Sequence, residues 1–360
     1  MVIIIFQKST IMKYIKNNLI PALGVVLALS AVSCKNGSND FPDHEDGVTA
    51  YFAYQYPATC VILGDYPDGD NSLNLQHKFQ ILATQGGAYK SKNLKIDVVV
   101  DPSLVENLTF SDGTPVKVMP DNYYSMESTV FTKKADYLFG TDVTLTDAFF
   151  ADPDAVKNTY VIPVRMVNAI GADRILSGTP AVEGTNPAKC DASAWSVLPQ
   201  DYVLYCVKYI NPWHGSYLRR GVDKINDAQN GAYTDIRHAQ YVEKDEVVYL
   251  NTKSMQEVIF PLSTIVPDGE SVKTLKCDLL LTFNGDDITV STKTEGMTAS
   301  GTGKFVKLGD KNSYNNADHD AIYLDYKVDF GPRQFTTLDT LVIRSREVAP
   351  EFNFNPTYSN

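Results

Sequence analysis

The chain has 360 residues, a formal net charge of −11 and a hydrophobic content of 44%. The acidic excess repels nucleic acid and anionic lipid headgroups, which argues against both as partners. The length and the apolar content predict about two domains, each with a core of its own.

The N-terminal segment is typical of a lipoprotein signal. A basic segment that includes Lys13 precedes an apolar stretch, which ends in small residues directly before Cys34. The stretch is too short to span a bilayer, and Met12 is the expected start of translation. We therefore expect residues 1–33 to be removed and the Cys34 thiol to be acylated, with ordinary secretion as the alternative. The lipid would anchor the chain in the outer membrane, facing outside the cell.

Residues 34–47 are polar and rich in Gly, Asp and Asn, which predicts a flexible tether. After the tether, apolar residues alternate with period two, which is typical of strands that bury one face and leave the other partly wet. The clearest alternating runs are 94–100, 160–166, 203–209, 277–283 and 322–330.

Turn signals separate these runs, and helix-forming segments are scarce. Asn284-Gly285 stands between two alternating runs and predicts a hairpin. Residues 148–158 predict one short helical turn, for which Asp152 or Asp154 is the expected cap. Many short strands with few helices indicate β-sandwiches or β-barrels.

The domain boundary is expected at 211–212, where a strongly apolar strand ends. This divides the chain into β domains at 48–211 and 212–350, followed by a C-terminal tail at 351–360. The long Pro- and Gly-rich connection at 177–201 is a candidate binding loop, because loops of this length in compact domains are usually functional or disordered.

Catalytic and metal-binding motifs are absent from the sequence. There is no GxSxG, no phosphate-binding Gly-rich loop and no HExxH, and the five histidines are scattered singly. No cofactor is therefore expected. Residues 65–71 space oxygen ligands like a calcium loop but lack the terminal Glu, so calcium remains an alternative.

The four remaining cysteines permit two disulfides. We expect Cys206 and Cys277 to be free and buried, whereas Cys190 could form a bridge.

Aromatic residues are the positive signal for function. The chain has 21 Tyr, and rings with a polar handle suit stacking on sugar faces. Trp195 is the favoured platform because it lies in the long connection, whereas a structural role is favoured for Trp213 and Tyr217. The candidate ligand-binding residues are Trp195, Trp213, Tyr217, Tyr233, Tyr241 and Tyr314.

The segment WHGSYLRRG, at 213–221, resembles the opening of a lipocalin-like barrel, in which an aromatic residue plugs the floor. Arg344 or Arg346 of the last strand would then stack over that ring as a cation–π cap.

Several stretches together resemble the surface lipoproteins of glycan-utilisation (starch-utilisation-system-like) loci in gut anaerobes. They include GVTAYFAYQYP, NTYVIPVRMVNAIGADRILSG and YVLYCVKYINPWHGSYLRRG. The resemblance implies an all-β fold: an immunoglobulin-like β-sandwich followed by a lipocalin-like β-barrel or a second β-sandwich. It also implies a glycan ligand and an outer-membrane transporter complex as a partner.

The leading hypothesis is a non-catalytic cell-surface glycan-binding lipoprotein. The residues after 211 are too few for the hydrolase barrel of about 250 residues, which favours binding over hydrolysis. The alternatives are a structural or adhesive assembly lipoprotein and a glycoside hydrolase.

Overall fold

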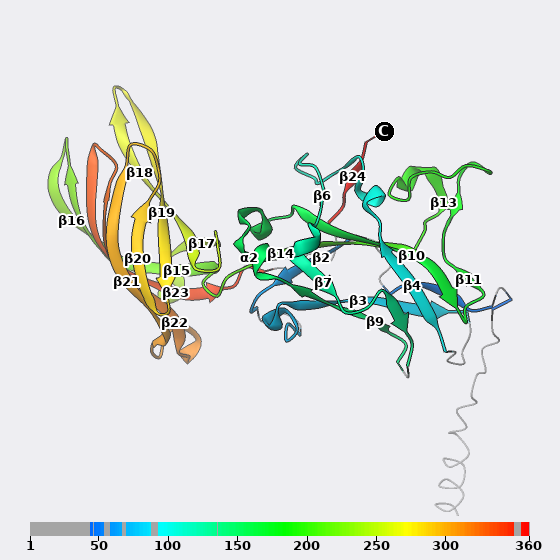
Figure 1. Cartoon of the computed structure of the whole chain (residues 1–360). Coiled ribbons are helices and arrows are strands. Elements are labelled where there is room, and N and C mark those ends of the chain that lie inside the picture. Colours follow the sequence, from blue (N-terminus) through cyan, green and yellow to red (C-terminus); the bar gives the residue numbers. More distant parts are fainter. Residues whose placement is uncertain are drawn as a thin grey trace, which may run out of the picture.

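The computed structural model describes residues 44–45, 47–53, 58–66, 70–87, 93–134, 136–348 and 354–359. Figure 1 shows two β domains arranged end to end. The signal peptide and the expected lipid-attachment site Cys34 lie outside the described residues. Within the described part of the chain, no helix has both the length and the apolar character needed to cross a membrane.

The first domain is a β-sandwich of two sheets, as the alternating pattern predicts. The first sheet contains, in spatial order, β11 (Arg174–Ile175), β1 (Thr49–Phe52), β3 (Lys78–Gly86), β9 (Phe139–Leu145) and β7 (Tyr124–Met126). The second contains β2 (Ala58–Leu63), β14 (Tyr202–Tyr209), β10 (Tyr160–Ile170), β4 (Lys95–Val100) and β8 (Val130–Thr132), and β6 (Lys117–Val118) also pairs with β10.

The core of the sandwich lies between the two sheets, where each strand directs alternate side chains inward. Ile81 of the first sheet and Ile96 and Val164 of the second are fully buried in it. Strand β14 is an exception to the expectation of one wet face. Its Tyr205 faces this core, whereas Leu204, on the opposite side, belongs to a second buried cluster.

That second cluster exists because two segments cover the outer face of β14. One includes Phe110, and the other is the C-terminal segment 354–359. Phe354 is 5% exposed, and its ring centroid lies 5.5 Å from that of Phe110. Strand β24 (Thr357–Tyr358) pairs with β5 (Leu108–Thr109), so the C-terminus returns from the second domain to the first (Figure 1).

The predicted helical turn is confirmed. Helix α2 (Asp147–Ala151) is followed by a 3-10 turn at Pro153–Val156. The Asp152 side chain accepts a hydrogen bond from the backbone N–H of Asp154 at 2.8 Å, which caps this turn. The other 3-10 turns are Asn74–Gln76, Pro102–Val105, Asp121–Tyr123, Ala192–Ala194, Val242–Lys244 and Tyr314–Asn316.

The connection at 177–201 forms a small two-stranded sheet on the first domain. Its strands are β12 (Thr179–Pro180) and β13 (Trp195–Val197). Cys206 and Cys277 are free thiols and are buried, as expected. Cys190 makes no bridge, because its thiol donates to the Leu104 carbonyl instead.

The second domain is an eight-stranded antiparallel barrel to which a ninth strand, β16, is added. The barrel strands are β15 (Gly215–Asp227), β17 (Glu246–Thr252), β18 (Glu257–Asp268), β19 (Ser271–Asn284), β20 (Asp287–Thr292), β21 (Thr298–Asp310), β22 (His319–Asp329) and β23 (Arg333–Ser345). Pairing of β15 with β23 closes the barrel. The predicted hairpin at Asn284-Gly285 is confirmed, because Asn284 pairs with Asp287.

The wall of the barrel is incomplete on one side. Strand β17 pairs with the first half of β15, and β16 (Gly231–Arg237) pairs with the second half. Strands β17 and β18 are joined only through residues 251–252 and 258–259. Among the described strands, the rest of β18 therefore has no partner on that side, and the wall is open between β16 and β18.

The covered face of β14 yields a stability prediction. Phe354→Ala should destabilise the first domain by about 3–5 kcal/mol, because it removes a buried ring from the second cluster. Guanidinium unfolding followed by circular dichroism measures this effect, with the exposed neighbour Asn355→Ala as the matched control. Equal unfolding midpoints for the two variants would show that the C-terminal segment does not support the fold.

Candidate functional site in the barrel

Aromatic packing closes the end of the barrel at which β15 begins. Trp213 stacks on Phe283 with ring centroids 3.7 Å apart and planes 12° apart. Tyr217 is 2% exposed, and its hydroxyl donates to the Trp213 carbonyl at 2.9 Å. Arg346 hydrogen-bonds the Pro212 carbonyl with its guanidinium, whereas the expected role was a cation–π cap. The structure therefore places Trp213 and Tyr217 in the packed floor of the barrel.

Tyr314 lies at the same closed end, in the connection between β21 and β22. Its ring stacks on His319 with centroids 3.8 Å apart, and its hydroxyl donates to the Ile343 carbonyl at 2.7 Å. Both its ring and its hydroxyl are thus engaged within the protein. Tyr241 follows β16 and is 58% exposed, but it does not line a hollow described below.

Trp195 belongs to the other domain. Its indole N–H donates to the Ala188 carbonyl at 3.0 Å, and the Lys189 ammonium lies 5.6 Å from its ring centroid. Strands β13 and β16 lie at opposite ends of the molecule (Figure 1). Trp195 is therefore not brought together with the aromatic residues of the barrel.

The opening in the barrel wall leads into a hollow of about 410 Å³, which we call the barrel hollow. Its volume is in the range of small-molecule sites, about 300–1,000 Å³. Of the predicted site residues, only Tyr233 lines it. Its lining residues are Arg219, Asp223, Ile225, Tyr233, Asp235, Arg237, Glu246, Leu262, Ser263, Thr264, Ile265, Tyr326, Val328, Phe330, Arg333, Phe335 and Thr337.

One wall of the barrel hollow carries a row of four functional side chains. Glu246 stands opposite Arg219 of β15, and Arg237, Asp235 and Tyr233 stand opposite residues 221, 223 and 225. Directly opposed residues of antiparallel strands share a face, and steps of two residues are about 6.8 Å long. The register thus gives the order Glu246, Arg237, Asp235, Tyr233 toward the open end.

Buried charges form the base of the barrel hollow. The Asp339 side chain is fully buried and accepts from Arg219 Nε at 2.9 Å, Arg237 Nη2 at 2.6 Å and the Tyr326 hydroxyl at 2.8 Å. Asp223 accepts from Arg237 Nε at 2.6 Å and Nη2 at 3.1 Å. We call Arg219, Asp223, Arg237 and Asp339 the barrel ion network. These four charged side chains pair with one another, and this pairing compensates for the hydration that they lose on burial.

Gly221 makes this network possible. It lies between Arg237 of β16 and Asp339 of β23 in the register. A Cβ atom there would lie 2.5 Å from Asp339 Oδ1 and 2.2 Å from the Leu338 carbonyl. Only a residue without a side chain lets the guanidinium cross β15 to reach the carboxylate.

A second charged link spans the open end. Arg333 hydrogen-bonds Asp227 of β15 and donates through Nη1 to the Thr264 hydroxyl and the Ile265 carbonyl of β18. The pKa of Asp227 is lowered to about 2, because the backbone N–H groups of residues 230 and 229 donate to its carboxylate and Arg333 pairs with it. This link joins β18 to β15 and β23, two strands with which β18 does not pair.

The pKa of Asp223 reflects the same kind of balance. Burial acts to raise it, but the hydrogen bonds from Arg237 and Thr337 and the positive charges of Arg237 and Arg219 hold it below its usual value. The carboxylate therefore stays ionised in the folded barrel at neutral pH.

The sequence patterns did not indicate the ion network, although a signal was present. Arg219, Asp223 and Asp227 have the same parity along β15 as the buried residues Tyr217 and Ile225. Period-two alternation places all five on the inner face of a strand. Charged residues at core-facing positions of a strand are thus the signal that would have found the site.

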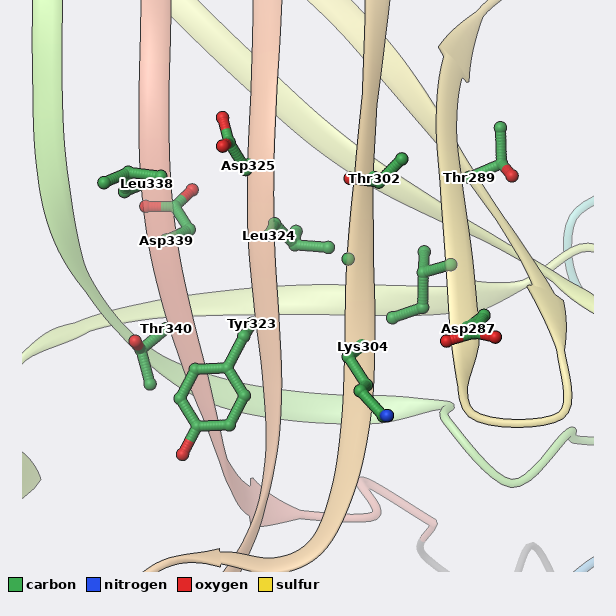
Figure 2. Close-up of a pocket in the computed structure, with 12 residues that line it drawn as sticks. Asp287, Thr289, Thr302, Lys304, Tyr323, Leu324, Asp325, Leu338, Asp339 and Thr340 are labelled. Carbon is green, nitrogen blue, oxygen red and sulfur yellow. The ribbon is translucent and has the colours of Figure 1, made fainter.

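A second hollow, of about 670 Å³, lies on the outer face of the barrel (Figure 2). Tyr323, Leu338, Lys304 and Asp325 are among the residues that line it, and they come from neighbouring strands of one wall. The barrel hollow is bounded by β16 and β18 from opposite sides and carries a fixed charge arrangement. It is therefore the better candidate for a ligand site.

The calcium alternative rests on a loop of which the structure describes only Asp65, Tyr66, Asp70 and Asn71. The Asn71 amide nitrogen donates to the carbonyls of Gly64 and Tyr66. Across the described residues, no group of three or more His, Cys, Asp or Glu side chains is arranged to hold a metal ion.

The ion network yields a prediction about stability. Asp339→Asn should destabilise the barrel by about 3–5 kcal/mol, because it removes the charge that pairs with two buried guanidinium groups. Asp325→Asn, on the exposed face of the neighbouring strand β22, is the matched control. Thermal unfolding of both variants measures the difference, and a wild-type melting temperature for Asp339→Asn would contradict the assigned role.

The lowered pKa values predict acid sensitivity. Asp223 and Asp227 titrate at lower pH in the folded state than in the unfolded state, whose Asp pKa is about 3.9. Their contribution to stability is therefore complete above about pH 4 and is lost below it, for Asp227 as the pH falls through about 2. Melting temperatures between about pH 7 and about pH 2.5 should fall less steeply for Asp223→Asn than for the wild type. If the melting temperatures of the two proteins fell equally with pH, the contribution of Asp223 to stability would be ruled out.

The barrel and the sandwich match separate family models. The family described as a domain of unknown function (DUF5627) matches residues 212–347, and a family described as an N-terminal domain matches residues 43–173. No curated protein matches the chain.

Among the solved structures, one relative is similar to most of the chain. A Bacteroides ovatus protein of unknown function is 42% identical, with a TM-score of 0.81 over 88% of this chain and 100% of that one. An auxiliary nutrient binding protein from Bacteroides thetaiotaomicron is 12% identical, with a TM-score of 0.35 over 80% of this chain and 90% of that one. A proposed carbohydrate binding protein from Bacteroides ovatus is 12% identical, with a TM-score of 0.27 over 85% and 100%. At such low similarity, these two names describe those proteins only. The chain belongs to the same family as the 42% identical Bacteroides ovatus protein.

Proposed function

We propose that this protein is a non-catalytic saccharide-binding protein and that the barrel hollow holds the ligand. One observation carries the proposal: an exposed aromatic ring, Tyr233, lies in a row with charged side chains along one wall of a hollow of suitable size. Saccharides present apolar C–H faces and many hydroxyl groups. A site for them therefore needs a flat ring beside hydrogen-bonding groups.

The residues of the barrel hollow can meet both needs. Tyr233 is 42% exposed, so its ring is accessible for stacking. Asp235 can accept hydrogen bonds from sugar hydroxyls. Phe330 and Phe335 add apolar surface to the lining. Few fixed contacts in an open hollow favour weak binding, which repeated units of a polysaccharide would strengthen.

The location of this activity is proposed from the sequence. Acylation of Cys34 would anchor the protein in the outer membrane, with the polar tether at 34–47 holding both domains outside the cell. A saccharide captured there could pass to an outer-membrane transporter. Growth-phase labelling with a radioactive fatty acid tests the anchor, because Cys34→Ala would abolish the label.

An assembly role by strand addition fits the barrel opening less well. Strand addition needs main-chain donors on the open edge. Pro261 and Pro267 lie in the half of β18 that has no partner toward β16, and proline has no N–H to donate. The opening therefore suits a small ligand better than an added strand.

Replacement of the proposed stacking ring tests the site. Tyr233→Ala should weaken saccharide binding about tenfold or more, because a central aromatic contact is lost. Affinity electrophoresis and a glycan array with the chain from Lys35 onward would first identify a ligand, and calorimetry would then measure its affinity.

Trp195→Ala is the matched control in the other domain. It should leave the affinity unchanged if the barrel hollow is the site. Loss of binding in Trp195→Ala but not in Tyr233→Ala would move the site to the connection at 177–201. Absence of any saccharide ligand for the folded protein would contradict the proposed function itself.

A further inference from the structure

The charge balance of the barrel hollow bears on which saccharides it accepts, and this step rests on the proposed function. Three guanidinium groups lie in or beside the hollow: Arg219, Arg237 and Arg333. Five carboxylates accompany them: Asp223, Asp227, Asp235, Glu246 and Asp339. Three positive charges against five negative ones give a formal charge of −2.

The arginines are largely occupied before any ligand arrives. Arg219 Nε pairs with Asp339 at 2.9 Å, and its Nη2 donates to the Tyr326 hydroxyl at 3.1 Å. Arg237 pairs with Asp223 and Asp339 through Nε and Nη2. Within the described residues, its Nη1 is buried and has no hydrogen-bond partner, and Glu246 Oε2 lies 3.9 Å away from it.

Arg333 is also engaged. It pairs with Asp227, and its Nη1 donates to Thr264 and Ile265 of β18. An arriving carboxylate or sulfate would therefore find little donor capacity in these three described arginines, because the unpartnered Arg237 Nη1 is itself buried. To form further hydrogen bonds with these arginines, the acidic group would have to displace a buried Asp from its arginine, which would leave that Asp unpaired.

Two carboxylates, by contrast, are accessible to a ligand. Asp235 is exposed and makes no ion pair or side-chain hydrogen bond within the described part of the chain. The Glu246 side chain is 52% exposed, with Oε2 at 3.3 Å from Arg219 Nη1. In the register they flank Arg237 on the same wall, and Asp235 is the one that stands next to Tyr233.

We propose that the barrel hollow selects uncharged or amine-bearing saccharides and rejects those that carry carboxylate or sulfate groups. Asp235 and Glu246 accept charge-assisted hydrogen bonds from hydroxyl or ammonium groups of the ligand. The same two carboxylates repel an acidic sugar across a partly desolvated hollow, where charges interact more strongly than in bulk water.

A glycan array tests this selectivity even before a single ligand is identified. Each acidic polysaccharide, such as a polygalacturonan, is printed beside its carboxyl-reduced form, which has the same linkages and no charge. Neutral and amine-bearing glycans complete the array, and the chain from Lys35 onward, with both domains, is applied. We expect the bound spots to be neutral or amine-bearing and each acidic glycan to bind at least about tenfold more weakly than its reduced form.

Asp235→Asn then identifies the residue responsible. It should reduce the discrimination between an acidic glycan and its reduced form on the order of tenfold. Asp287→Asn, an exposed carboxylate on the outer face of β20, is the matched control and should leave the discrimination unchanged. Because the Asp235 side chain has no partner among the described residues, its replacement is not expected to unfold the barrel.

The outcomes separate the two proposals. Preferential binding of acidic glycans, or equal discrimination by Asp235→Asn and the wild type, would overturn the charge selectivity while leaving saccharide binding in place. A blank array with folded protein would overturn saccharide binding and the selectivity with it.

Discussion

The pairing of β15 with β23 is the constraint on which the second domain depends. It closes the barrel and sets β15 edge to edge with a strand more than a hundred residues later in the chain. Asp227 comes to stand opposite Arg333, and Asp223 opposite Thr337. Gly221 leaves the space through which Arg237 reaches Asp339. Closure and charge pairing thus depend on each other, because the register that closes the barrel also brings the buried charges to their partners.

The closed end of the barrel supplies apolar packing, whereas the candidate ligand site lies toward its open end. At the closed end, Trp213, Phe283 and Tyr217 form an apolar floor, which supplies the burial that a small barrel needs. Above it, Arg219 packs 5.3 Å from the Phe260 ring centroid and joins the floor to the ion network. The network in turn fixes one wall of the barrel hollow. A ligand site built on paired strands is more rigid than one built on loops, so recognition can rely on preformed geometry.

The alternating pattern predicted the strands because most of them face a single core. The runs at 94–100 and 277–283 became β4 and β19, and the turn at Asn284-Gly285 formed where local chemistry alone decides. Strand β14 departs from the pattern because a distant segment, containing Phe354, covers its outer face. The candidate site was harder to predict for the same reason. Tyr233 was among the predicted residues, whereas Asp235, two residues further along the same strand, and Glu246 were not. Glu246 joins their row only when β16 and β17 both pair with β15.

Saccharide binding in the barrel hollow is the central proposal for this protein. A crystal structure of the chain from Lys35 onward with a bound oligosaccharide tests it most directly. We predict a sugar ring on the face of Tyr233, with its hydroxyl groups directed at Asp235. A sugar bound at Trp195 or on the outer face of the barrel, with the hollow empty, would contradict the claim.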